Sequence, residues 1–424
     1  MPNSRLKPTA EGQSLRFSIQ FVRISAYLKQ SLMSKKAKII NHNILVLSAV
    51  SLFTDVASEM LYPIMPIYLK TIGFSIVLIG VLEGFAEATA GLSKGYFGNL
   101  SDKIGTRLPF IQIGYLLSAI SKPMMALFTY PLWIFFARTI DRLGKGIRTG
   151  ARDALLSDEA TPATKGRVFG FHRSMDTLGA VIGPSLALIY LTYRPDDYKT
   201  LFYIAFLPGL ISIGFTFLIK ENRVRQRTSL QQSKTGWLDF LNYWKTSPPL
   251  YRKLSTALLI FTLFNSSDVF LMLKIKEAGL GDTSAIGAYI FYNLIYAISS
   301  YPLGSLADRI GMKKILVSGL ILFAIVYVGM AYAESNLAFL VLFAIYGVYA
   351  AATEGIAKAW ITNICHRDDT ATAIGTFTAF QSIATLLASS FAGLIWFYAG
   401  ASTTFLLSGI IALVVAIYIS RFKN

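Results

Sequence analysis

Acidic side chains lie inside long apolar stretches of this chain, at spacings that bring them together on one helix face. Asp55 and Glu59 are four residues apart in one stretch, and Glu83 and Glu87 repeat that spacing in the next. A carboxyl group in apolar surroundings can hold a proton near neutral pH, as reversible proton carriage requires. We therefore take these four acids as candidates for proton coupling. Asp55 and Glu59 rank first, because no basic residue lies within one helical turn of either along the chain.

One apolar stretch carries many charges of both signs. Within it, Asp141 lies one helical turn from both Arg138 and Lys145, where side chains meet. A charge in hydrocarbon costs about 2.5–3.5 kcal/mol on insertion scales, so such groups face a cavity or a partner. Arg138 and Asp141 are candidates for coupling, with a structural ion-pair network as the alternative. We expect Arg148 and Arg152, further along the stretch, to reach the cytoplasmic surface.

Two further clusters complete the set of charged candidates. Asp176 lies one turn from both His172 and Arg173, so it joins the candidates for proton coupling. Glu354 precedes Lys358 by four residues, the favourable order for an ion pair within one helix, and we predict a structural role for that pair. The predicted ion-pair network comprises Arg142, Lys145, Arg148, Arg152, His172, Arg173, Glu354 and Lys358. The second half is poorer in such groups, which favours coupling in the first half.

A ten-residue pattern occurs twice, at 98–107 and 304–313, with an offset of 206 residues. Each copy holds an aspartate, basic residues and two glycines between apolar stretches, and glycine permits a tight reversal and close helix approach. The residues that define the pattern are Gly98, Asp102, Lys103, Gly105 and Arg107 in one copy and Gly304, Asp308, Arg309, Gly311 and Lys313 in the other. The simpler alternative is a loop whose charges only fix orientation in a membrane.

Composition indicates a protein that crosses a membrane many times. Of the 424 residues, 54% are hydrophobic and 15% are charged, and apolar segments of spanning length recur along the whole chain. The net charge of +17 gathers in certain loops rather than on one folded face, which argues against nucleic-acid binding. The single cysteine, Cys365, excludes a disulfide framework and a four-cysteine metal site.

Twelve membrane-spanning helices are predicted, six in each half. They lie near 43–69, 75–97, 108–128, 131–153, 165–192, 199–220, 252–275, 283–303, 315–333, 337–362, 370–396 and 401–420. The domains are then a basic extension (1–42), a six-helix bundle (43–220), a basic linker (221–251) and a second bundle (252–424). The excess of Lys and Arg in the extension and linker places both termini and the linker in the cytoplasm. We expect residues 1–32 to add no function, because Met33 would serve equally well as a first residue; a basic interfacial helix is the alternative.

Residues 43–421 resemble the major facilitator superfamily, on the strength of the two G-x-L-[SA]-D-[KR]-x-G-x-[RK] copies. The resemblance implies an all-α membrane fold of two pseudo-symmetric six-helix bundles, with substrate bound between them and exposed to alternate sides. It also implies that the repeated pattern forms a cytoplasmic latch, and that Arg138 modulates a proton site.

The fifth predicted helix is similar to the antiporter signature of exporters in this superfamily. Gly170, Gly179, Gly183 and Pro184 match that signature, whereas Ala187-Leu188 replaces its final glycine pair. We therefore expect a secondary transporter, a proton-driven exporter of a small organic molecule such as a drug, siderophore or amphipathic metabolite. A proton-coupled uptake symporter or a uniporter is the alternative, and a non-transporting receptor or assembly factor is an alternative of another class.

Further expectations follow from this interpretation. The chain is not expected to be an enzyme, and it has no G-x-x-x-x-G-K-[ST] loop for ATP. We expect no metal or cofactor besides the proton gradient, a small-molecule substrate, no nucleic-acid partner, and a monomer in the lipid bilayer of a bacterial inner membrane.

Overall fold

The computed structural model describes residues 39–221, 236–266 and 268–422, apart from some side chains within helices, that of Glu83 among them. Most of the predicted extension and part of the linker therefore lie outside the described residues. Contacts divide the chain into Met1–Asn41 and His42–Asn424, and the account below concerns the second unit. Within the described ranges the regular structure is helical, with no strand.

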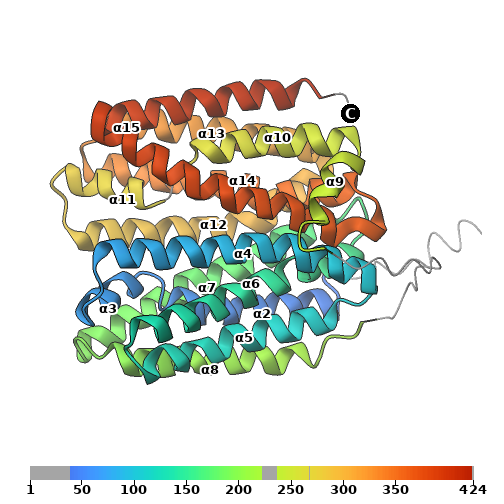
Figure 1. Cartoon of the computed structure of the whole chain (residues 1–424). Helices are drawn as coiled ribbons and strands as arrows, with labels where there is room; N and C mark the ends of the chain where they lie inside the picture. Colours follow the sequence, from blue (N-terminus) through green and yellow to red (C-terminus); the bar gives the residue numbers. More distant parts are fainter. Residues whose placement is uncertain (1–38, 222–235, 267, 423–424) are drawn as a thin grey trace, which may run out of the picture. The chain divides into compact units, whose positions relative to one another are not determined.

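The first half holds α2 (His42–Glu59), α3 (Met65–Thr71), α4 (Ile76–Ile104), α5 (Leu108–Leu127), α6 (Pro131–Asp158), α7 (Lys165–Tyr193) and α8 (Tyr198–Thr216). The second half holds α9 (Phe240–Thr246), α10 (Pro249–Phe264), α11 (Asp268–Glu277), α12 (Asp282–Ile310), α13 (Met312–Tyr332), α14 (Asn336–Ile364), the short 3₁₀ helix η1 (Arg367–Asp369) and α15 (Thr370–Ser420). Figure 1 shows these helices running side by side.

Local sequence explains where several helices begin. The Ser75 hydroxyl accepts a hydrogen bond from the Leu78 amide at 3.1 Å and caps α4, and Ser335 caps α14 through the Ala338 amide at 3.2 Å. Pro131 starts α6, where its missing N–H leaves no bond unmade.

Two predicted spans are interrupted. The first span breaks between α2 and α3, beside Pro63, which has no amide hydrogen to donate. The span over 252–275 breaks at Asn265, whose side-chain amide donates to the Tyr349 hydroxyl at 3.2 Å. The last two spans join as α15, with a change of direction at Gly400, where φ is 83°.

The repeated ten-residue patterns form helix ends rather than turns along their whole length. The helices α4 and α12 continue to Ile104 and Ile310, so the chain reverses only at Gly105 and Gly311, where φ is 77° and 103°. Both values lie in the left-handed region, which glycine adopts without steric cost.

The two halves meet along α4 with α15 and along α7 with α12 (Figure 1). These contacts are reciprocal. A Cβ atom on Gly98 would collide with the Ala371 carbonyl oxygen and approach Gly375, and one on Gly304 would collide with that of Gly166 and approach Gly170. Those two glycine contacts are related by nearly the same offset as the sequence repeat, so each half presents equivalent surfaces to the other.

Seven helical segments of the described part are long and apolar enough to cross a membrane by themselves. They are Leu108–Leu127, Lys165–Tyr193, Tyr198–Thr216, Pro249–Glu277, Met312–Tyr332, Asn336–Ile364 and Arg367–Ser420, the last long enough for two crossings. The helix α6, which holds most of the intramembrane charges, is not among them.

Candidate functional site

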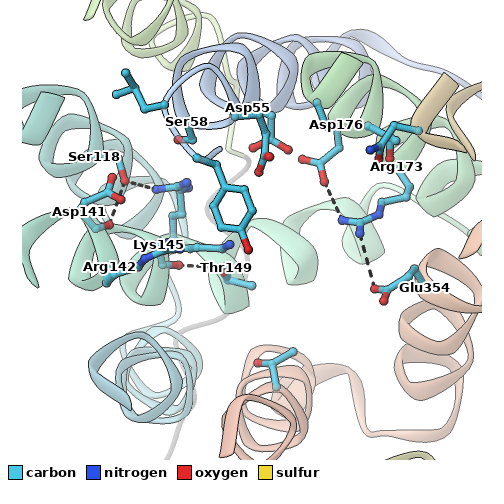
Figure 2. A pocket seen from close by; sticks show the side chains of 18 of the residues that line it. Asp55, Ser58, Ser118, Asp141, Arg142, Lys145, Thr149, Arg173, Asp176 and Glu354 are labelled. Atoms are coloured by element: carbon cyan, nitrogen blue, oxygen red, sulfur yellow. Dashed lines mark hydrogen bonds and ion pairs between the residues drawn. The ribbon is translucent and has the colours of Figure 1, made fainter. Parts of the chain in front are cut away.

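A cavity of about 350 Å³ lies between helices of the two halves (Figure 2). Its charged lining contains more basic than acidic side chains. The basic ones are Lys94, Lys122, Arg138, Arg142, Lys145, Arg148, Arg152, Arg173 and Lys358, and the acidic ones are Asp55, Glu59, Asp141, Asp176 and Glu354. Tyr289, Tyr292 and Tyr296 of α12 contribute aromatic surface to the same space.

The helix α6 carries charged side chains along the face that lines the cavity, and glycines on the faces that pack against other helices. Arg138, Asp141, Lys145, Arg148 and Arg152 are spaced by three or four residues, so they follow one face of the helix, and all line the cavity. Glycines occupy other faces and bring α6 against its neighbours.

These glycines leave no room for a side chain. A Cβ on Gly144 would lie 2.6 Å from the Gly114 carbonyl oxygen of α5, and one on Gly146 would collide with Ser93 of α4. The Gly-Lys-Gly sequence thus holds α6 tightly against α4 and α5 while Lys145 faces the cavity.

Asp141 has a different main partner from the one predicted. The Lys122 ammonium of α5 donates to its carboxylate at 2.6 Å, and the Ser121 hydroxyl donates at 3.2 Å. Arg138 lies 3.7 Å away on the same helix, but Lys145 makes no ion pair with Asp141. Lys122 was not singled out from the sequence, although a lysine inside an apolar stretch indicates a residue that needs an acidic partner.

The expectation that Arg148 and Arg152 reach the membrane surface is wrong. Arg148 is 5% exposed; it donates to the Ser118 hydroxyl, and its guanidinium lies 4.5 Å from the centre of the Tyr115 ring. Arg152 pairs with Asp153 at 2.8 Å. Both side chains find polar partners inside the helix bundle, which removes the need to reach water.

Glu354 and Lys358 also do not form the predicted pair within one helix. Lys358 instead donates to Asp153 of α6 at 2.8 Å, and Glu354 lies 3.6 Å from Arg173 of α7. Oppositely charged groups of the other half are closer than the helical neighbour, so both residues join the two halves across the cavity.

The acids Asp55, Glu59 and Asp176 come together at the cavity, as Figure 2 shows for Asp55 and Asp176. The Asp55 carboxyl lies within hydrogen-bonding reach of Asp176. The Ser51 hydroxyl also donates to Asp176, and Arg173 donates to it at 2.7 Å.

Glu87 and His172 stand apart from this group of acids. Glu87 does not line the cavity; it lies within hydrogen-bonding reach of Ser382 on α15. His172 is buried behind the cavity, and neither of its ring nitrogens has a hydrogen-bond partner in the described part of the chain. The predicted His172–Arg173–Asp176 cluster therefore reduces to the Arg173–Asp176 pair.

Arg173 connects the two halves beside these acids. It pairs with Asp176 on its own helix, donates to the Tyr296 hydroxyl of α12, and lies 3.6 Å from Glu354 of α14 (Figure 2). A change of charge at Asp176 would therefore act on contacts with the second half.

Asp102 of the first repeat contacts the start of a helix in the second half. Its carboxylate accepts hydrogen bonds from the Thr372 amide at 2.6 Å and the Thr372 hydroxyl at 2.7 Å, at the first turn of α15. Arg107 of the same repeat donates to it at 2.7 Å. Negative charge at a helix N-terminus is stabilising. We name this group, Asp102 with Arg107 and Thr372, the first latch.

Asp308 of the second repeat makes the equivalent contact with α7. It accepts from the Gly166 amide at 2.7 Å, the Arg167 amide at 3.0 Å and the Arg167 side chain at 3.1 Å. We name Asp308 with Gly166 and Arg167 the second latch.

Two other basic residues of the repeats have partners outside the latches. Lys103 lies 3.3 Å from Asp239, and Lys313 donates to the Phe422 carbonyl at 2.8 Å. Arg309 makes no ion pair with any residue that the structure describes.

Besides Glu354, the second half contributes a further acid near the cavity. Asp268, at the start of α11, accepts hydrogen bonds from the hydroxyls of Tyr292 at 2.5 Å and Tyr346 at 2.7 Å. It lines an adjoining cavity of about 270 Å³. Over the described residues, no group of three His, Cys, Asp or Glu side chains could hold a metal ion.

Comparison with known proteins places these observations in a family. Residues 47–295 and 276–423 match the family model described as Major Facilitator Superfamily. A relative called an uncharacterized MFS-type transporter, from Methanocaldococcus jannaschii, is 33% identical over 88% of this chain and 93% of its own length. The quinolone resistance protein NorA of Staphylococcus aureus is 22% identical over 49% of this chain and 54% of its own.

Solved structures share the fold at low sequence identity. The human organic anion transporter MFSD10 has a TM-score of 0.77 with 16% identity, covering 89% of this chain and 98% of that one. The transporter FucP in its outward conformation has a TM-score of 0.71 with 14% identity, covering 91% of this chain and all of its own.

Proposed function

Since this chain belongs to the Major Facilitator Superfamily, whose members are transporters and not enzymes, we propose that it is a proton-coupled exporter of a small organic molecule. It acts as a monomer in the cytoplasmic membrane, with both termini in the cytoplasm, and uses the proton gradient without a cofactor. The cavity between the halves receives the substrate, and rocking of the halves exposes it to each side in turn.

The contact between Asp55 and Asp176 is the observation that carries this proposal. Two carboxylates in contact repel each other when both are ionised, so such a pair holds a proton between them. Arg173 and Ser51 both donate to Asp176, which stabilises its ionised form, so we assign the shared proton to Asp55. A proton held there faces the cavity, where it can exchange.

Arg173 provides a physical route from proton to movement. Release of the proton from Asp55 adds a negative charge beside Asp176, which draws the Arg173 guanidinium toward these two acids of the first half. That weakens its contacts with Tyr296 and Glu354 in the second half. The latches and the Lys358–Asp153 pair then remain as contacts that must break when the halves rock apart.

Packing of α7 supports export. Gly179 and Gly183, which match the antiporter signature, lie directly against α2: a Cβ on Gly179 would lie 2.6 Å from the Leu52 carbonyl oxygen, and one on Gly183 2.7 Å from the Met60 amide nitrogen. The names of two relatives, NorA and the multidrug resistance protein MdtG, agree with export.

Proton-coupled uptake is the second candidate. One observation favours it: the signature's final glycine pair is replaced by Ala187-Leu188, and Ala187 is buried in a cluster of apolar side chains. Uptake would use the same cavity and the same acids.

The test is proton movement in proteoliposomes as candidate compounds are added, comparing wild type with Asp55→Asn, Glu59→Gln and the matched control Glu334→Gln. Glu334 is an exposed acid outside the cavity. We expect substrate-dependent proton movement in wild type and the control, and its loss in Asp55→Asn. Movement in the direction opposite to the substrate establishes export by antiport, and movement in the same direction establishes symport.

Retention of full proton movement by Asp55→Asn would refute the assignment of the proton to this pair. Substrate movement without any proton movement in the wild type would refute coupling and leave a uniporter.

A further inference from the structure

We infer that the cavity between the halves binds an organic anion, held at Lys145 and Arg148 of α6. This inference rests on the proposed function, because it names the class of molecule that the transporter would carry. Binding of that molecule can be measured without measuring transport.

Most cavity cations already have an acidic partner within the protein. Lys122 and Arg138 are paired with Asp141, and Arg173 with Asp176. Arg152 and Lys358 share Asp153, which lies just outside the cavity lining. The charges of these cations are therefore offset in part, by acids that some of them share, before any substrate binds.

Lys145 and Arg148 differ from those cations, whereas Lys94, which also has no ion pair among the described residues, donates to the Ser382 hydroxyl at 2.9 Å. No hydrogen bond or ion pair of the Lys145 ammonium is present among the described residues, although it faces the cavity and is solvent-exposed there. Arg148 is 5% exposed, and its hydrogen bonds within the described part of the chain go to the neutral oxygens of Ser118 and Gly114. Its Nε atom is buried with no hydrogen-bond partner in the described structure. Both therefore retain uncompensated charge.

The nearest acids do not remove that charge. Asp55, Glu59 and Glu87 act on Lys145 electrostatically, but none of them forms an ion pair with it, and Asp55 carries the shared proton in the proposed function. Uncompensated charge within a membrane is costly, by about 2.5–3.5 kcal/mol for each residue on insertion scales. A bound anion would supply the missing counter-charge for two cations one helical turn apart.

The two cations suit an oxyanion. Arginine donates in a fixed planar geometry that matches carboxylate or phosphate oxygens, and lysine adds a mobile point charge. Figure 2 shows Lys145 reaching from α6 toward the space that Asp55 and Asp176 border. Tyr289 and Tyr292 of α12, in the other half, also line the cavity and give a surface on which the uncharged body of the ligand would lie. The cavity of about 350 Å³ suits a ligand of metabolite size.

The experiment measures binding to the purified full chain by its melting temperature in detergent, at one pH and without a proton gradient. The probes are sets that differ only in charge: 2-naphthoate, 2-naphthalenemethanol and 2-naphthylmethylammonium, with gluconate, glucose and glucosamine as a sugar-like set. Naphthyl phosphate separates phosphate from carboxylate recognition. In at least one set, we expect the anion to raise the melting temperature more than the neutral and the cationic members of that set do.

Variants then locate the anion. Lys145→Gln should weaken the apparent affinity by roughly tenfold, the size expected for loss of a charge-assisted hydrogen bond, and Lys145→Arg should restore most of it. Lys199→Gln, which removes an exposed lysine outside the cavity, should bind as wild type does. The Lys145 ammonium makes no hydrogen bond or ion pair with a described residue, so these variants should fold. Arg148→Lys, which keeps the charge but loses the planar donor geometry, should also weaken the binding of the anion.

The inference fails if the cations stabilise most, if no anion stabilises in either set, or if Lys145→Gln and Lys199→Gln bind the anion equally. It is separable from the proposed function: anion binding that survives in Asp55→Asn, with proton movement unaffected, would overturn the coupling and keep the anion site. If no anion is preferred while proton coupling is intact, the anion site is refuted and the proposed coupling stands.

Discussion

The two latches occupy equivalent places in the two halves, yet their cations come from different sides. In the first latch the cation, Arg107, belongs to the same half as Asp102. In the second it is Arg167, which belongs to the half opposite Asp308. Both carboxylates are buried, with side chains 2% and 1% exposed. When the halves separate, Asp102 keeps its counter-ion, whereas Asp308 loses its own.

This difference indicates that the second latch opposes separation more strongly than the first. Leaving a buried carboxylate unpaired costs more than the loss of its neutral hydrogen bonds alone. Sequence symmetry thus conceals an energetic asymmetry. The predictions below test it, from the largest expected effect to the smallest.

Gly304→Ala and Gly98→Ala should both favour separated halves, by about 1–3 kcal/mol each, because a new Cβ would collide with a backbone carbonyl of the other half. The distance between spin labels on α4 and α15, and on α7 and α12, measures the separation. Equal effects would show that the steric part of the two contacts is symmetric. Gly214→Ala, where a Cβ meets nothing within 4 Å, is the control.

Asp308→Ala should favour separation by about 2 kcal/mol and Asp102→Ala by about 1 kcal/mol, since only the first change removes an ion pair between the halves. The same spin-label distances give the two populations. If Asp102→Ala has the larger effect, the asymmetry inferred from the counter-ions is wrong.

Arg167→Gln should favour separation by about 0.5–1 kcal/mol, because its side chain is 25% exposed and water screens the pair. Arg107→Gln should leave the separation nearly unchanged and lower the melting temperature instead. Added salt should reduce the Arg167→Gln effect, and a salt-independent effect would contradict an electrostatic cause.

The reactivity of Cys365 is expected to change least among these measurements, but it is the simplest to measure. Burial raises the pKa of its thiol to about 11, so at pH 7 almost all of it is protonated and unreactive. Alkylation by a maleimide should be slow in wild type and accelerate with rising pH as the thiolate forms. Asp102 helps to raise this pKa, so Asp102→Ala should accelerate alkylation through the charge it removes. Asp308→Ala should accelerate it relative to wild type by exposing this end of α14, and an unchanged rate would remove that link. Denatured protein sets the fast limit.

The fold was predictable because its signals are local. Apolar runs between basic loops identify spans, and the repeat of Gly98 at Gly304 indicates two related halves. Helix breaks beside Pro63 and at Asn265 were missed, because a short interruption leaves the apolar run intact.

The candidate site was predictable only in part. Spacing along a helix correctly joined Arg173 to Asp176, three residues apart. It could not show that Lys358 reaches Asp153 of the other half, or that Asp141 pairs with Lys122 of the next helix. Such partners depend on how helices pack, and a single sequence carries no record of that.

The reciprocal glycine contacts have a consequence for how the chain holds together. Gly98 meets Gly375 as Gly304 meets Gly170, which is the pairing found in an isologous dimer, where one surface recognises a copy of itself. Two separately synthesised halves would carry the same complementary surfaces. They should therefore assemble in one membrane without a covalent connection between them.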